Sequence, residues 1–133
     1  VEIVQTITLA SEYSDLAPYA NQLSSKLQLS QKILQKLMPF AMKGNYERYL
    51  SDANLFMEFM SIIVLSWLWL EMAVDSKETL AAGKLKYDKN FYESKIHTMK
   101  FYFKYELPKT TSLAESLMSD EVLTVKDEKE YIL

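Results

Sequence analysis

The chain has 133 residues, of which 49% are hydrophobic, with a net charge of -3 and no cysteine. This is the length of one ordinary domain, which can bury a core without disulfides or bound metal. The lack of cysteine excludes a disulfide framework and thiolate chemistry, and it fits a reducing compartment. The acidic balance and the single arginine, Arg48, argue against a nucleic-acid partner, because surfaces that bind nucleic acid need clustered basic side chains.

Glycine and proline are rare in the chain, whereas leucine, lysine, glutamate, alanine and methionine are frequent. These residues favour helices, whereas sheets need frequent turn residues and runs of β-branched side chains. The composition therefore predicts an all-α fold. Residues 1–11 have apolar side chains close to helical spacing, although their β-branched members would also suit a strand. We expect them to be the end of a truncated helix, cut from a longer protein.

The first complete helix is expected to begin near Ser11, Ser14 or Asp15, whose side chains can cap a helix, and to end at Gly44. Pro18 is tolerated because it lies in the first turn. One stripe of side chains at helical spacing predicts the buried face of this helix. Its members are Leu16, Tyr19, Leu23, Leu27, Leu34, Leu37 and Ala41.

The next helix is expected to contain the most apolar stretch of the chain and to organise the other helices around it. It should begin at Asn45 or Ser51 and end at Ala82, directly before Gly83. Within it, residues 55–70 have large apolar side chains on every side. Such a segment has to be enclosed by other helices, by another domain or by lipid.

Polar residues in this helix form two stripes that lie about 120° apart around the helix axis. The first contains Glu47, Ser51, Asn54, Glu58 and Ser61, and the second contains Glu71, Asp75 and Glu78. A left-handed supercoil accounts for only about half of this rotation, since it drifts by about 20° per heptad. We infer that different neighbours cover the two halves of the helix.

Lipid is the least favoured of the three enclosures. A membrane-spanning helix needs about 20 apolar residues, but this stretch is bounded by Asn54 and Glu71 and already contains Glu58. Each carboxylate at the centre of a bilayer would cost about 2.5 to 3.5 kcal/mol. The sequence therefore predicts a buried helix of a soluble domain and no membrane span.

A third helix should follow the loop at residues 83–89, because Asn90 and Glu93 have the spacing of a capping box. Pro108 should end or kink this helix near Glu106. Its core stripe is predicted from apolar residues at helical spacing. The members of that stripe are Tyr92, Ile96, Met99, Phe103 and Leu107.

A short helical continuation is expected to reach Met118, and residues 119–133 form a charged tail without periodicity. We therefore divide the chain into a helical domain over residues 1–118 and this tail. Three long helices and a truncated N-terminal helix predict an antiparallel up-and-down helical bundle.

No motif for catalysis, cofactor binding or metal binding occurs in the chain. The single histidine, His97, is expected to be an exposed partner of Glu93 rather than a metal ligand. Glu58 and Glu71 lie about 140° apart on one helix, so they cannot act as acid and base on one substrate. We therefore assign no catalytic, cofactor-binding or metal-binding residue in this segment.

Five aromatic side chains are candidates for contacts with another domain or a partner. Phe91, Tyr102 and Tyr105 form a second row on the third helix, with more aromatic surface than a face in water needs. Trp67 and Trp69 point to nearly opposite sides of the central helix, so one pocket cannot use both, and core packing is their default role.

Two stretches of the sequence are distinctive: residues 52–73, DANLFMEFMSIIVLSWLWLEMA, and residues 91–108, FYESKIHTMKFYFKYELP. The second contains an F-Y-x-x-K element followed by F-Y and L-P elements. These elements are Phe91, Tyr92, Lys95, Phe101, Tyr102, Leu107 and Pro108. Both stretches resemble the extra C-terminal helical domain of large bacterial acyl-CoA dehydrogenases, and the resemblance covers residues 1–118.

This resemblance implies a non-catalytic domain that packs on the catalytic domains of an FAD-dependent enzyme. Enzymes of that family use a carboxylate base and remove two hydrogens across the α and β carbons of an acyl-CoA thioester. Their FAD-binding segments and catalytic carboxylate have no matching positions here, so we expect FAD in the full-length enzyme and no cofactor in this segment. The implied partners are the upstream catalytic domains of the same chain, the acyl-CoA substrate of the full enzyme and a second copy in a homodimer. The implied location is the cytoplasm.

An alternative function is a free-standing helical protein-interaction module whose aromatic row docks a protein partner. An independent helical enzyme is the third and weakest reading, since the chain lacks recognisable catalytic motifs. Sequence upstream of Val1 would separate these alternatives.

Overall fold

The computed structural model describes residues 2–42 and 53–119, and within these two ranges the secondary structure consists of helices with no strand. The predicted all-α fold is therefore confirmed. The helices are α1 (Glu2–Ser11), α2 (Ala17–Met42), α4 (Ala53–Ala82), α5 (Lys89–Tyr105) and α6 (Lys109–Met118).

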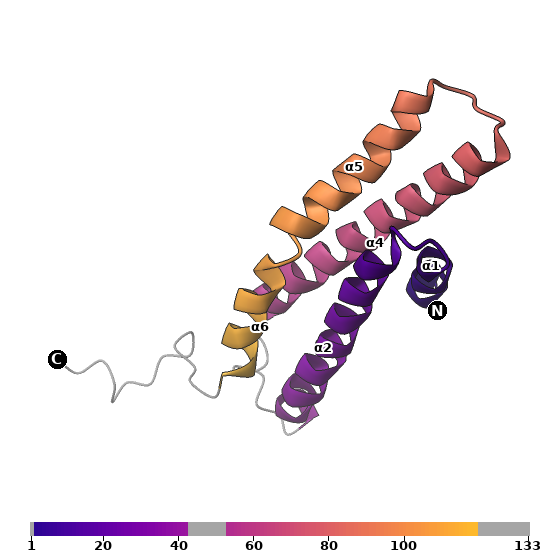
Figure 1. Ribbon diagram of the computed structural model, residues 1–133. Helices are drawn as coiled ribbons and strands as arrows, with labels where there is room; N and C mark the ends of the chain where they lie inside the picture. Colours follow the sequence, from indigo (N-terminus) through magenta and orange to yellow (C-terminus); the bar gives the residue numbers. More distant parts are fainter. Residues whose placement is uncertain (1, 43–52, 120–133) are drawn as a thin grey trace, which may run out of the picture.

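The central element is α4, which contacts each of the other described helices. Figure 1 shows α5 returning along α4 in the antiparallel direction after the turn at residues 83–88, with α6 continuing beyond a bend. The helices α1 and α2 pack against each other and against α4. The helix that was expected to organise the chain therefore lies at its centre.

The end of α4 lies where the sequence predicts it. The last helical residue is Ala82, and Gly83 follows with a φ of 72°. The Gly83 N–H donates a hydrogen bond to the carbonyl of Thr79 at 3.1 Å, which satisfies one of the final carbonyls of the helix. The predicted starts at Asn45 and Ser51, and the predicted helix end at Gly44, lie outside the described residues.

The start of α5 differs from the prediction. The helix begins at Lys89 and its N-cap is Asp88, so Asn90 lies inside the first turn and the predicted capping box is wrong. Glu93 instead places its carboxylate 3.6 Å from Lys89 Nζ, one helical turn earlier. The helix therefore begins two residues earlier than it would with Asn90 as its N-cap.

Pro108 divides the third predicted helix into two, as expected. The first part, α5, ends at Tyr105, and Pro108 is the N-cap residue of α6. The amides of Glu106 and Leu107 both donate to the carbonyl of Tyr102, at 2.8 and 3.0 Å. The third predicted helix is therefore α5, of 17 residues, and the predicted short continuation to Met118 is α6, of 10 residues.

The predicted core stripe of the third helix is confirmed. Tyr92, Ile96, Met99 and Phe103 are buried in α5, and Leu107 is buried directly after it. These side chains lie at spacings of three and four residues, so they form one face of the helix. That face packs on α4, the neighbour that α5 contacts most extensively.

The core stripe predicted for α2 is wrong at one position. Leu16, Leu23 and Leu37 are buried as expected, but Ile33 is fully buried while Leu34 is 39% exposed. Adjacent residues point about 100° apart on a helix, so two neighbouring apolar residues offer two alternative faces. The packing of α2 buries the face that carries Ile33.

Candidate functional site

One side of α4 is apolar and exposed. Its side chains lie at i, i+7, i+8, i+11 and i+15, which is the spacing of a single helical face. We call this surface the α4 face, and its members are Met57, Val64, Leu65, Leu68 and Met72, which are 37–68% exposed. The described helices therefore enclose the apolar stretch on one side and leave its other side open.

Polar residues border the α4 face at both ends. Glu58 and Ser61 are exposed toward its start, and Glu71, Asp75 and Glu78 are exposed toward its end. Exposed polar side chains therefore stand at both ends of an apolar centre. The described helices α1, α2, α5 and α6 all contact α4, and the inference that different neighbours cover its two halves stays a prediction.

A shallow depression of about 420 Å³ lies along one margin of the α4 face, between α4, α1 and α2. It is lined by Glu2, Ile3, Leu27, Met60, Ile63, Val64 and Trp67. Val64 belongs to both surfaces, so the depression and the α4 face are continuous. The first residues of α1 therefore stand at the edge of the exposed apolar surface.

A second depression, of about 230 Å³, lies along the other margin, between α4 and α5. Its lining residues are Met72, Asp75, Ser76, Thr79, Phe91, Tyr92 and Lys95. Met72 links this depression to the α4 face. Phe91, a predicted contact residue, therefore lies beside the exposed surface of the central helix.

The two tryptophans are half-buried and pack against the core. Trp67 donates its indole N–H to the hydroxyl of Thr6 at 2.9 Å, and Thr6 in turn donates to the carbonyl of Glu2. Trp67 thus attaches α4 to α1 and also lines the first depression. Trp69 is in contact with the core from another side of the helix.

The aromatic row predicted on the third helix is divided between different surroundings. Phe91 packs on Tyr87 and Tyr92, with ring centroids 4.6 and 5.3 Å apart. Tyr102 is half-buried against the core, and this burial raises its pKa. Tyr105 is exposed and stacks at a tilt on Phe101, 4.7 Å away. Phe91 and Tyr105 are therefore exposed, whereas Tyr102 is half-buried.

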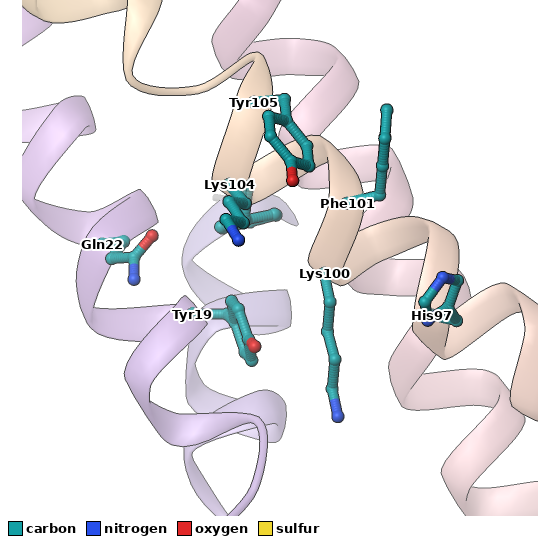
Figure 2. A pocket seen from close by; sticks show the side chains of 8 residues that line it. Tyr19, Gln22, His97, Lys100, Phe101, Lys104 and Tyr105 are labelled. Atoms are coloured by element: carbon teal, nitrogen blue, oxygen red, sulfur yellow. The ribbon is translucent and has the colours of Figure 1, made fainter.

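An open groove of about 600 Å³ lies between α2 and α5. Figure 2 shows Tyr19 and Gln22 on the α2 side, with Lys100, Lys104 and Tyr105 on α5. Phe103 forms part of the lining and meets Tyr19 edge-on, with ring centroids 5.5 Å apart. His97 and Phe101 complete the lining. The groove is weakly basic, because Lys100 and Lys104 line it and no carboxylate does.

The residues that were considered for metal binding or acid–base catalysis lie apart from one another in the structure. His97 is exposed at the groove, while Glu58 and Glu71 are exposed on α4. In residues 2–42 and 53–119, no group of three or more His, Cys, Asp or Glu side chains is arranged to hold a metal ion. The described residues provide an exposed apolar surface and a shallow basic groove.

One ion pair joins the chain between α1 and α2 to the second half of α4. The ammonium group of Lys77 contacts the carboxylate of Asp15. The hydrogen bond from Lys77 lowers the pKa of Asp15, against the opposing effect of partial burial. This pair acts together with the Trp67–Thr6 bond, since both attach the N-terminal helices to α4.

Among the described residues, α4 is the one helix that has the length and composition to cross a membrane. In its most apolar 18-residue window, 28% of the residues are buried. Length and composition alone are weak grounds for a span, since the core helix of a folded domain can satisfy both. The α4 face accounts for the low buried fraction of this helix.

The chain was compared with known proteins at the level of families, curated sequences and solved structures. A family model described as "Acetyl-CoA dehydrogenase C-terminal like" matches residues 1–126. The match includes every described helix and both of the distinctive stretches. No curated protein and no solved structure matches the chain significantly. The family resemblance drawn from the sequence is confirmed.

Proposed function

The chain belongs to the acetyl-CoA dehydrogenase C-terminal-like family, and on this premise we propose that it is the non-catalytic C-terminal domain of an FAD-dependent acyl-CoA dehydrogenase. The domain packs on the catalytic domains, which hold the FAD and the catalytic carboxylate. The family match over residues 1–126 is the observation that carries this proposal.

The structure supports a packing role through its distribution of apolar surface. A helix with large apolar side chains on every side is stable in water only when its whole circumference is covered. In the described residues, α1, α2, α5 and α6 cover one side of α4 and leave the α4 face exposed. An exposed apolar patch bordered by polar residues is typical of a surface that contacts another protein.

The proposed enzyme is a cytoplasmic bacterial flavoprotein of fatty acid oxidation. It removes one hydrogen from the α carbon and one from the β carbon of an acyl-CoA thioester, and its FAD accepts both. The residues of this chain take no part in that reaction. Their contribution is to stabilise the catalytic domains and to shape contacts between domains or between the subunits of a homodimer.

The proposal is tested with the full-length protein encoded by the complete reading frame. We expect that protein to purify with bound FAD, and a saturated acyl-CoA added without oxygen should bleach the flavin absorbance. A segment limited to residues 1–133 should purify without flavin. A reading frame that starts close to Val1, or stoichiometric flavin on residues 1–133 alone, would contradict the proposal.

A free-standing interaction module is the alternative. The exposed side chains of Phe91, Phe101 and Tyr105 favour it, because exposed aromatic rings are common in protein interfaces. In that case the complete reading frame would encode no flavoprotein domain, and the same chain would bind a separate protein. The reading frame therefore discriminates between the two functions.

A further inference from the structure

We infer that the α4 face is the surface that docks on the catalytic domains preceding this domain in the same chain. This inference rests on the proposed function and names the surface through which the domain acts. The occupying surface should be apolar, with basic side chains at its edge that complement the carboxylates around the α4 face.

The α4 face has the composition of an interface centre. Its five apolar side chains are long or branched, and Met57 reaches an exposed fraction of 68%. Contiguous apolar patches larger than a few hundred Å² are rare on monomeric proteins and mark interaction sites. The two depressions extend the patch to α1 and α5, which gives it the breadth of a docking surface rather than of a single helix.

Under the proposed function, the position of α1 favours a preceding domain of the same chain as the occupant. Glu2 and Ile3 line the depression that contains Val64, so the chain enters the fold beside the α4 face. Any domain joined in front of α1 is attached at this edge, and a short connection raises its effective concentration there. A preceding domain of the same chain therefore meets the α4 face more readily than a separate molecule does.

The charges around the α4 face disfavour lipid as the occupant. Glu58, Glu71, Asp75 and Glu78 are all exposed at its ends. Helices that lie on membranes have basic residues beside their apolar face, because the headgroups of anionic lipids attract lysine and arginine. An acidic border repels such a surface, whereas it can pair with lysine or arginine on a protein.

The test places a photoreactive side chain at the centre of the face in the full-length enzyme. Leu68 is replaced by p-benzoylphenylalanine, the protein is irradiated, and the cross-linked peptides are identified by mass spectrometry. We expect the cross-links to join residue 68 to peptides that precede residue 1 in the chain. The same replacement at Phe101, which lines the groove between α2 and α5, is the matched control and should give few such cross-links.

Each other outcome overturns the inference. Cross-links from residue 68 to residues 1–133 of another molecule would show a contact between copies, and cross-links to lipid would show a membrane surface. Absence of cross-links would show that the face is uncovered. If the full-length protein is an acyl-CoA dehydrogenase in any of these cases, the docking surface is wrong while the proposed function stands.

A second measurement introduces a charged side chain into the α4 face and follows release of the domain by proteolysis. Leu68→Asp would place an unpaired carboxylate in the docked surface, and burial of an unpaired charge is unfavourable. A cost of about 1.4 kcal/mol corresponds to a factor of ten in the docking equilibrium. Limited proteolysis of the full-length enzyme should then release the C-terminal domain at least about tenfold faster than from Phe101→Asp. Equal release from the two variants contradicts the inference.

Discussion

The indole N–H of Trp67 lies 2.9 Å from the hydroxyl oxygen of Thr6, and this hydrogen bond joins the central helix α4 to α1. Thr6 is itself buried, so its hydroxyl is the partner that a half-buried tryptophan requires away from water. The bond fixes α1 against α4 at the depression that borders the α4 face. The side of the molecule at which the chain enters is therefore held in place by a specific polar contact.

Replacement of Thr6 by valine should destabilise the chain. Thr6→Val keeps the shape of the side chain but removes the acceptor, which leaves the Trp67 N–H without its partner. A buried polar group that loses its hydrogen bond costs about 1 to 3 kcal/mol. Urea unfolding followed by tryptophan fluorescence would measure the loss, and Thr6→Ser, which keeps the hydroxyl, should recover most of it. Equal stability of the valine and serine variants would show that the bond contributes nothing.

Phe103 should be among the most sensitive core positions. Its side chain is 2% exposed and meets the ring of Tyr19 edge-on, so Phe103→Ala should lower the free energy of unfolding by about 3 to 5 kcal/mol. Phe101, two residues earlier on the same helix, is 54% exposed. Phe101→Ala should change the free energy of unfolding by less than about 0.5 kcal/mol. Both values come from chemical denaturation. A loss below about 1 kcal/mol at Phe103 would mean that the core is misplaced.

The sequence was sufficient to predict the end of α4 and the core of α5. Gly83 follows the last periodic residue, and a left-handed φ at that position is a backbone requirement that glycine meets at low cost. The α5 stripe could be identified beside the second aromatic row because Lys100 and Lys104 directly follow its core residues Met99 and Phe103. Local sequence therefore decides these features.

Other features depend on neighbours that periodicity does not describe. Ile33 and Leu34 are adjacent and both apolar, and only the placement of α2 decides that Ile33 is buried. The same limit applies to residues 55–70, because a helix that is apolar all round does not indicate which side its neighbours leave open. The polar residues at both ends of the α4 face were the available signal, since polar side chains in an apolar helix tend to stay in contact with water.

Acidic pH should weaken the attachment of the N-terminal helices to α4. The hydrogen bond from Lys77 lowers the pKa of Asp15 in the folded chain below its ordinary value. The pair therefore adds stability above the unfolded pKa, and this stability is lost as pH falls through the lower folded pKa. Both side chains are partly exposed, so solvent screening keeps the energy small.

Carbon-13 NMR of the Asp15 carboxyl group would measure this pKa directly. The folded chain should titrate below the ordinary aspartate range, and Lys77→Gln should move the midpoint back toward it. Lys95→Gln is the control, because Lys95 contacts the ring of Phe91 and lies away from the ion pair. An unchanged Asp15 midpoint after removal of the Lys77 ammonium group would show that the ion pair is absent in solution.

The central claim, that the apolar side of α4 is covered by the catalytic domains, is tested most directly by methionine oxidation of the full-length enzyme. Met57 and Met72 lie on the α4 face, whereas Met38 and Met118 are exposed on α2 and α6 and serve as internal references. Brief exposure to hydrogen peroxide followed by mass spectrometry should show Met57 and Met72 protected while Met38 and Met118 form sulfoxides. Oxidation of Met57 and Met72 as fast as the two references would contradict the account.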